Sequence, residues 1–161
     1  MISNELSILG LKLILDFISP EEEKVILEKI TKSPATGTQN RNTIKRYGSS
    51  VPYGGCVVSD KIPHHFDVVL DRLVEQNLLE VRPDSITVNE YMPKQRITAH
   101  IDSMTSGPII CVLSLQSPAT MVFERNKVRH SVRLPERCLT LMSGELRNLW
   151  THEIMPVETV R

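Results

Sequence analysis

The pattern of hydrophobic positions changes about halfway along the chain. In the first half, apolar residues recur every three or four positions, and this spacing predicts amphipathic helices over residues 19–30 and 63–79. From residue 85 onward, short apolar runs are separated by Pro, Gly, Ser and Asn, which is typical of strands and turns. Helices followed by many short antiparallel strands predict an α+β fold with a sandwich or barrel-like β core packed on helices.

The expected strands are short and closely spaced. Arg125 and Asn126 stand between two of the runs and predict a hairpin turn. The strands are expected at residues 11–17, 43–48, 85–91, 108–115, 119–123, 127–134, 138–142 and 146–152, and a further strand ends within 98–104.

The first long helix has a clear start signal. Ser19 can cap it, Pro20 suits its first position, and Glu22 follows three residues after the cap. The preceding run, 8–17, is apolar but too short to cross a bilayer, and it has neither a basic leader nor a small-residue cleavage site. We therefore interpret it as a core strand rather than a targeting segment.

Composition narrows the class of protein. A chain of 161 residues is expected to form one domain over 1–161. The 19 basic residues balance the 19 acidic ones, so only a local patch could attract nucleic acid. Cys56, Cys111 and Cys138 lie far apart without CxxC spacing, which favours free thiols in a reducing compartment, the cytoplasm or nucleus. We expect a monomer without a membrane partner.

A candidate for chemistry is the segment ITAHID, residues 97–102. Residues two apart on a strand share a face, so His100 and Asp102 would present an imidazole and a carboxylate side by side. Such a pair is common by chance, and a plain hydrogen-bonded surface pair is the alternative. His152, which ends an apolar run, supplies a possible third ligand.

Two histidines and one carboxylate form the facial triad of non-haem Fe(II) oxygenases, which leaves coordination positions open. Zinc would more often recruit thiolates or a third histidine, and the cysteines offer no cluster. We therefore predict iron at His100, Asp102 and His152. The other histidines, His64, His65 and His130, are interpreted as structural or surface residues.

A family resemblance extends this prediction. NEYMPKQRITAHID, residues 89–102, resembles the N-x-Y-x-P…H-x-D signature of the AlkB-like Fe(II)/2-oxoglutarate-dependent dioxygenases. Segments 113–117, 134–154 and 13–30 are also similar to that family, and 44–48 resembles its nucleotide-recognition strand. The resemblance implies a double-stranded β-helix (jelly-roll) core with N-terminal helices packed on one sheet. The branch that it most resembles contains the tRNA wobble-uridine hydroxylase domain.

Cosubstrate residues also follow from the resemblance. It implies that Asn89 and Tyr91 hydrogen-bond 2-oxoglutarate, although an ordinary strand-edge pair is the alternative. The family's last strand carries two arginines six apart, and this sequence stops at Arg161. Arg161 would then bind the far carboxylate of 2-oxoglutarate, or it would be a frayed end. The expectation is of a domain that lacks the last C-terminal strand, in a truncated form or with impaired cosubstrate affinity.

The polar stretch 33–55 reads as a long loop containing one strand, which could be a substrate lid or simply disordered. Basic and aromatic side chains in it could contact phosphates and stack on an extruded base, with a solvated loop as the alternative. These candidates are Arg41, Lys45, Arg46, Tyr47 and Tyr53. Arg147, five residues before His152 on an expected strand, need not face the site.

The activity implied by the resemblance is O2-dependent oxidative dealkylation or hydroxylation of a modified base. The substrate would be RNA, tRNA or single-stranded DNA. Two alternatives remain open at this point. The chain could demethylate or hydroxylate a protein side chain, or it could be a non-catalytic binding domain, because the terminal arginine strand is incomplete.

Overall fold

A computed structural model of the chain describes residues 4–35, 37–39, 42–50 and 58–158. The chain forms two compact units. Unit 1 combines Met1–Ser19 with Tyr91–Arg161, and unit 2 is Pro20–Glu90. The single domain expected over 1–161 stays a prediction.

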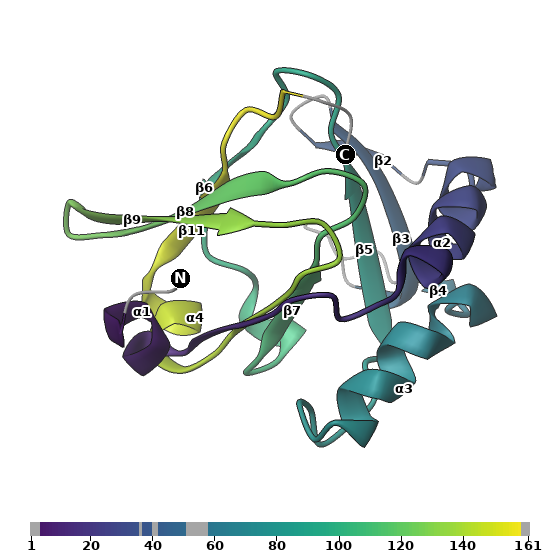
Figure 1. The fold of residues 1–161 in the computed structure, drawn as a ribbon, viewed down its shortest axis with the longest axis horizontal. Coiled ribbons are helices and arrows are strands. Elements are labelled where there is room, and N and C mark those ends of the chain that lie inside the picture. Colours follow the sequence, from purple (N-terminus) through teal and green to yellow (C-terminus); the bar gives the residue numbers. More distant parts are fainter. Residues whose placement is uncertain (1–3, 36, 40–41, 51–57, 159–161) are drawn as a thin grey trace. The chain divides into compact units, whose positions relative to one another are not determined.

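Unit 1 contains two antiparallel sheets that face each other (Figure 1). One sheet has the strand order β1-β10-β7, and the other has the order β6-β11-β8-β9. The elements are α1 (Asn4–Leu9), β1 (Leu11–Ile14), β6 (Ile97–His100), η2 (Met104–Ser106), β7 (Ile110–Leu113), β8 (Ala119–Arg125), β9 (Val128–Leu134), β10 (Leu139–Met142), α4 (Gly144–Leu149) and β11 (Thr151–Ile154).

The core of unit 1 lies between these sheets. Phe123 and Leu134 from the four-stranded sheet are fully buried, and Leu11 and Met142 from the other sheet belong to the same apolar cluster. Trp150 joins the cluster just before β11. Burial of apolar side chains from both sheets is the main term that holds such a sandwich together.

The hairpin between β8 and β9 confirms the turn predicted near Arg125 and Asn126. Its two central residues are Asn126 and Lys127, and both have positive φ, of 50° and 68°. Two successive residues with positive φ form the tight turn whose twist matches that of the flanking strands. The strands pair from Ala119 opposite Leu134 to Arg125 opposite Val128.

Two expectations for unit 1 are wrong. The run 8–17 is not one strand, because Ile8 and Leu9 belong to α1 and β1 covers only Leu11–Ile14. The expected strand at 146–152 is a helix, α4, followed by β11. Leu146, Leu149 and Trp150 stand three and four positions apart, which is helical spacing. A six-residue helix is too short for this pattern to stand out beside a strand pattern.

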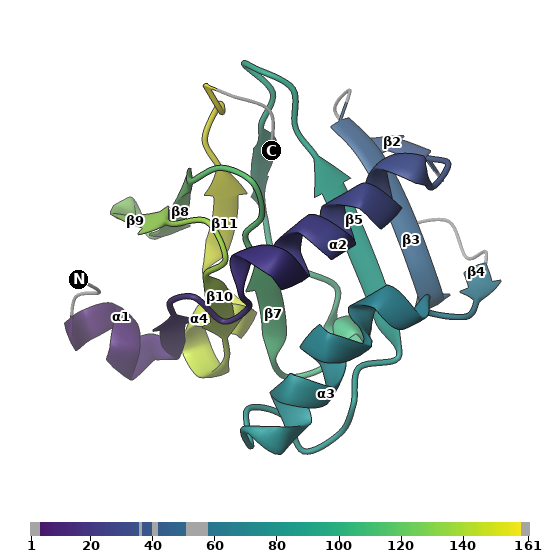
Figure 2. The same cartoon turned by 45° about the vertical axis from the view of Figure 1, so that its right-hand side comes forward.

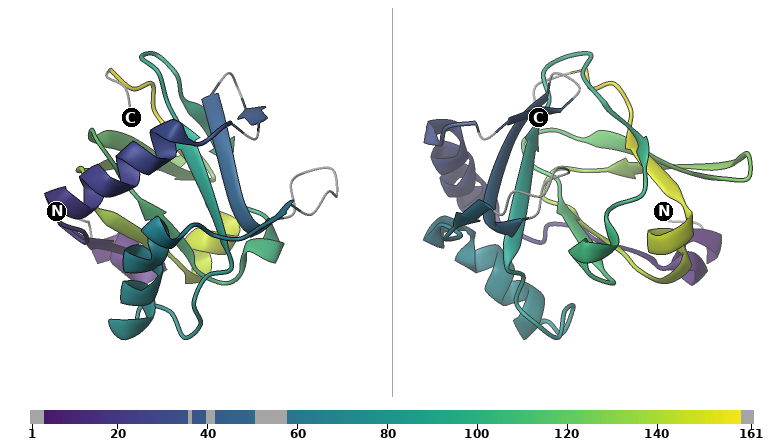
Figure 3. Two further views of the ribbon diagram at one scale, coloured as in Figure 1. Left: turned by 90° about the vertical axis from the view of Figure 1, so that its right-hand side faces the viewer. Right: turned by 180° about the vertical axis from the view of Figure 1, so that it is seen from behind.

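Unit 2 is a sheet with helices on one face (Figures 2 and 3). β3 is its centre: it pairs with β2, β4 and β5. The elements are α2 (Pro20–Lys32), β2 (Gly37–Gln39), β3 (Asn42–Ser50), β4 (Val58–Asp60), η1 (His64–Phe66), α3 (Asp67–Glu75) and β5 (Ser85–Glu90). The strand expected at 43–48 is confirmed as part of β3, whereas the loop expected before it is wrong at Gly37–Gln39, which form β2.

Specific side-chain contacts join the elements of unit 2. The guanidinium of Arg72 on α3 donates to both carboxylate oxygens of Glu22 on α2, at 3.0 and 2.6 Å. The rings of Tyr47 on β3 and Phe66 in η1 lie 5.3 Å apart. Both predicted helices are thus present, with α2 starting at Pro20 as the capping signal indicated. None of the helices in the described ranges combines the length and apolar character needed to span a bilayer.

Gly10 allows a close approach between the N-terminal segment and the turn before α4. Its φ is 112°, and its carbonyl accepts hydrogen bonds from the backbone and side chain of Ser143, at 3.0 and 3.2 Å. A Cβ added at Gly10 would overlap the carbonyl oxygen of Ser143. Gly107 has a similar φ of 84°, but a Cβ there would meet no atom of the described chain within 4 Å.

We expect Gly107→Ala to cost about 1–3 kcal/mol of unfolding free energy through backbone strain alone. Gly10→Ala should lower the unfolding free energy by about 1–3 kcal/mol more than Gly107→Ala does, because the overlap with Ser143 adds to the strain. Urea unfolding of the two variants measures the difference. Equal midpoints for the two variants would show that the approach to Ser143 is not tight.

Candidate metal centre

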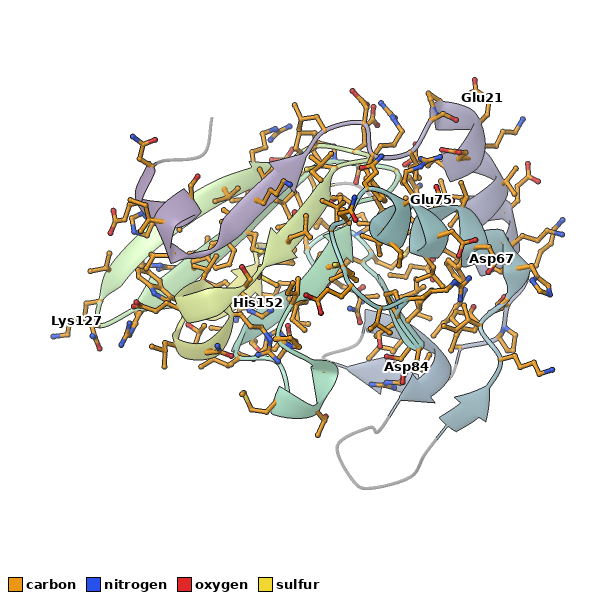
Figure 4. The ribbon with its side chains drawn as sticks, turned by 90° about the horizontal axis from the view of Figure 1, so that it is seen from below. Glu21, Asp67, Glu75, Asp84, Lys127 and His152 are labelled. Carbon is orange, nitrogen blue, oxygen red and sulfur yellow. The ribbon has the colours of Figure 1, made fainter. Side chains whose placement is uncertain are left out.

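His100 and His152 come together because they are register partners on neighbouring strands. His100 ends β6, and His152 lies opposite it on β11, the strand between β6 and β8. Their ring centroids are 4.4 Å apart. Cross-strand partners share one face of a sheet, so strand pairing alone brings together two residues that are 52 positions apart in the chain. Figure 4 shows His152 among other nitrogen-bearing side chains.

Asp102 completes the cluster from the turn after β6. One of its oxygens lies 3.4 Å from Nε2 of His100, and the other lies 3.4 Å from Nε2 of His152. The sequence-based expectation placed His100 and Asp102 on the same strand face. That geometry is wrong, because β6 ends at His100. The turn nevertheless directs the carboxylate back toward both imidazoles.

These three side chains have the spacing of a metal site. One ligand atom from each lies within 4.8 Å of the other two, and this is the one cluster of its kind among the described residues. Neighbouring ligands of an octahedral ion stand about 3 Å apart, so modest closure would let all three converge on one ion. Side-chain exposure is 32% for His100 and 27% for Asp102 but 10% for His152. The cluster is therefore closed on the β11 side and open on the other.

The orientation of the His100 ring suits a metal ligand. Its Nδ1 lies 2.8 Å from the carbonyl oxygen of Thr98 and donates to it. That bond keeps the proton on Nδ1 and leaves the lone pair of the neutral ring on Nε2, which faces Asp102. A ring held in this way presents its ligand atom before any ion arrives.

The charges and the burial of the three side chains determine their protonation states. When Nε2 of His100 is also protonated it donates to Asp102, and this hydrogen bond raises the pKa of His100. Burial works to raise the pKa of Asp102, but the hydrogen bond from His100 and the charges of His152, His100 and Arg147 together lower it. Burial lowers the pKa of His152 to about 4. At neutral pH the carboxylate is ionised and His152 is neutral, which are the forms that bind a metal.

Arg147 contacts the turn that carries Asp102; from the sequence, a place near the site was only possible for it. It is 3% exposed and donates from its guanidinium to the carbonyl oxygens of Asp102 and Ser103. Arg147 and His152 are five positions apart, and an odd separation places two side chains on opposite faces only when both residues lie on one strand. Because α4 intervenes, that parity argument fails. Because α4 has only six residues, its helical spacing does not stand out in the sequence, and no clear signal pointed to this contact.

The residues expected to bind 2-oxoglutarate are placed only in part. Tyr91 is buried and belongs to the apolar cluster of unit 1. Asn89 lies on β5 in unit 2, opposite Ile44 of β3. β5 ends at Glu90, so Tyr91 follows that strand, and the roles expected of Asn89 and Tyr91 stay predictions. Arg161 lies outside the described residues.

The candidate substrate residues fall in unit 2. Lys45 is 5% exposed, and its ammonium donates to the carbonyl of Ile30 at 2.6 Å. Tyr47 is 9% exposed and packs on Phe66. Both side chains are therefore buried in unit 2, and the contacts with substrate expected of them stay predictions. Arg46 is partly exposed. Arg41 and Tyr53 lie outside the described residues.

The remaining histidines and cysteines do not belong to the cluster. His64 is exposed and bonded to Asp67 at 2.9 Å, and His130 stacks beside Trp150 with ring centroids 5.5 Å apart. His65 packs against Phe66. Cys111 and Cys138 are free thiols, and Cys56 lies outside the described residues. Burial raises the pKa of Cys111 to about 11, so it is a protonated thiol and a poor metal ligand at neutral pH.

Known proteins are similar to this chain in sequence and in fold. Residues 20–160 match the 2OG-Fe(II) oxygenase superfamily. The mouse protein named "tRNA (carboxymethyluridine(34)-5-O)-methyltransferase ALKBH8" is 35% identical over 161 residues, which cover 91% of this chain and 24% of the relative. The chain thus spans about a quarter of that relative's length. A mimivirus protein, "Uncharacterized protein L905", is 30% identical over 91% of this chain and 73% of its own.

The solved structures agree at the level of the fold. The structure of OsALKBH1 superposes with a TM-score of 0.70 at 17% identity and covers 92% of this chain and 86% of its own. At that identity the likeness bears on the fold alone. It supports the jelly-roll core with helices that the sequence predicted.

The raised pKa of His100 makes metal binding pH-dependent. A metal takes the neutral imidazole, and His100 is protonated below its raised pKa, so protons compete there with the metal. We expect Mn(II) affinity to fall by up to about tenfold for each unit of pH below that pKa. His152 should add little competition above about pH 5, because its pKa is about 4.

Anaerobic Mn(II) titrations between about pH 8 and about pH 6 measure this slope. His64→Ala, which removes an exposed histidine bonded only to Asp67 in the contacts above, should leave it unchanged. Affinity that stays constant or rises toward pH 6 would contradict His100 as a ligand.

Proposed function

The chain belongs to the 2OG-Fe(II) oxygenase superfamily, and on this premise we propose that His100, Asp102 and His152 hold the iron of a nucleic-acid dioxygenase. The resemblance to AlkB-like dioxygenases is confirmed by the family match and by the relatives. The enzyme class is confirmed as well: the family consists of oxygenases that use Fe(II) and 2-oxoglutarate. The observation that carries the residue assignment is the convergence of the three side chains within 4.8 Å.

When bound, Fe(II) supplies, with 2-oxoglutarate and O2, the oxidising power that puts one oxygen atom into a substrate C–H bond and the other into succinate, with release of CO2. The chain's own residues prepare the site for this chemistry. Asp102 contributes the single negative charge of the ligand set, and the two histidines contribute neutral nitrogens. The Nδ1–H bond to Thr98 fixes which nitrogen of His100 is the ligand.

The exposure of the cluster separates its two sides. His152 is sealed by the sheet, whereas His100 and Asp102 face outward. We assign the cosubstrate, O2 and the substrate to the outward side, since three ligands on one side of an ion leave the opposite positions open. Tyr91, buried in the same unit, and Asn89 stay our candidates for orienting 2-oxoglutarate. Arg161 stays a candidate for its far carboxylate.

The substrate class is proposed from the relatives. The mouse relative's name describes a tRNA-modifying protein, and the chain matches about a quarter of it. We propose that this chain oxidises a modified base in RNA, with tRNA as the first substrate to test. The base must be extruded or single-stranded to reach a site of this kind. Arg46, partly exposed on β3, is the described residue that we retain for backbone contact.

Turnover of the cosubstrate tests the proposal. With Fe(II), ascorbate and millimolar 2-oxoglutarate, wild-type protein should form succinate, and Asp102→Ala should form none because it loses the anionic ligand. His64→Ala is the matched control, since it removes a histidine outside the cluster. Wild-type protein that binds metal but forms no succinate would establish the alternative of a non-catalytic binding domain.

The substrate is tested by comparing turnover on tRNA, on methylated RNA oligomers and on methylated single-stranded DNA. We expect product to form fastest on tRNA or RNA. Oxidation of DNA alone would refute the RNA assignment. Succinate formation that responds to none of these nucleic acids but rises with a methylated peptide would move the substrate to a protein side chain.

A further inference from the structure

Arg147 is a buried cation without a carboxylate partner among the described residues. It is 3% exposed, and no ion pair joins it to an Asp or Glu of that part of the chain. Burying a guanidinium costs free energy unless its N–H groups are bonded. Here two of those groups are bonded to main-chain carbonyls, and the Nε–H is buried without a hydrogen-bond partner in the described residues. A side chain retained under these conditions is positioned for a specific contact.

The two carbonyls that it binds belong to consecutive residues. Nη1 donates to the oxygen of Asp102 at 3.0 Å, and Nη2 donates to the oxygen of Ser103 at 2.6 Å. Guanidinium presents two parallel donors in a fixed plane, which suits two adjacent acceptors. Lysine, with a single ammonium, cannot reproduce that fork.

The segment that Arg147 holds has little other support from the sheet. β6 ends at His100, so the strand ladder does not extend to Asp102. The chain then enters η2, where the amide of Ser106 donates to the carbonyl of Ser103 at 3.0 Å. The oxygen of Ser103 thus accepts from both the η2 turn and Arg147. One contact therefore joins the ligand-bearing peptide to the loop that follows it.

We propose that Arg147 is a positioning residue that clamps the 102–103 peptides so that the carboxylate of Asp102 faces both histidines before the metal binds. This inference rests on the proposed iron site. The same clamp fixes η2, whose Met104 is 71% exposed. Helix α4 is thereby coupled to the metal ligand in the turn after β6.

The test compares Arg147→Met and Arg147→Lys with wild-type protein by anaerobic Fe(II) and Mn(II) titration. Loss of both donors in Arg147→Met should weaken metal binding by about tenfold to a hundredfold, as for other residues that orient ligands. Arg147→Lys keeps the charge and one contact and should recover part of that loss. The Mn(II) electron paramagnetic resonance spectrum should broaden in Arg147→Met, since the carboxylate is no longer held in one orientation.

Arg125→Met is the matched control. Arg125 on β8 forms an ion pair with Glu145, which lies on α4 as Arg147 does, but Arg125 makes none of the contacts with Asp102 or Ser103. It should bind metal like wild type. Equal losses in Arg125→Met and Arg147→Met would overturn the inference, because the effect would then be a general loosening of α4. Wild-type affinity in folded Arg147→Met would overturn it as well.

Asp102→Ala separates this inference from the proposed function. If Asp102→Ala retains metal, the iron site itself is misassigned. If it loses metal while Arg147→Met retains it, only the role of Arg147 fails. Should neither Arg147 variant fold, wild-type protein decides: the guanidinium resonances of Arg147 should shift on Zn(II) addition while those of Arg125 do not. Unshifted Arg147 resonances would contradict the clamp.

Discussion

The site depends on one carboxylate held between two imidazoles. One oxygen of Asp102 lies 3.4 Å from Nε2 of His100, and its other oxygen lies 3.4 Å from Nε2 of His152. Asp102 is the one anion among the three residues of the cluster. Two histidines on paired strands would repel one another if both were protonated. Asp102 raises the pKa of His100, but burial lowers the pKa of His152 to about 4, so the two rings are not protonated together at neutral pH. A divalent cation that binds Asp102 then displaces the proton of His100, because the metal needs the neutral imidazole as its ligand.

The rest of unit 1 sets the geometry of that carboxylate. The β11–β6 register puts the histidines opposite each other, and β11 pairs on both sides, with β6 and with β8. Helix α4 precedes β11 and carries Arg147 to the turn that holds Asp102. The turn before α4 is itself held by Gly10, whose carbonyl binds Ser143. A series of hydrogen bonds thus links the N-terminal segment to the peptide of the metal ligand, and in each of them a main-chain carbonyl accepts.

Local patterns predicted most of this arrangement, and tertiary contacts account for the parts they missed. Alternation and turn residues indicated β8, β9 and their hairpin, and the capping signal located the start of α2. The ligand types were evident from HxD and the later histidine. Their geometry was not, because Asp102 leaves the strand and is held by a residue from α4. Lys45 and Tyr47 were expected to contact substrate because of their charge and aromatic ring, whereas the structure shows both side chains buried in unit 2. Sequence spacing cannot report which face of β3 is covered.

The central claim is that His100, Asp102 and His152 bind one Fe(II) ion together. Anomalous diffraction at the iron edge from anaerobically grown crystals tests it most directly. The account predicts one iron peak per chain, at bonding distance from Nε2 of both histidines and from one oxygen of Asp102. A peak elsewhere, or one bound to the histidines with Asp102 turned away, would contradict it.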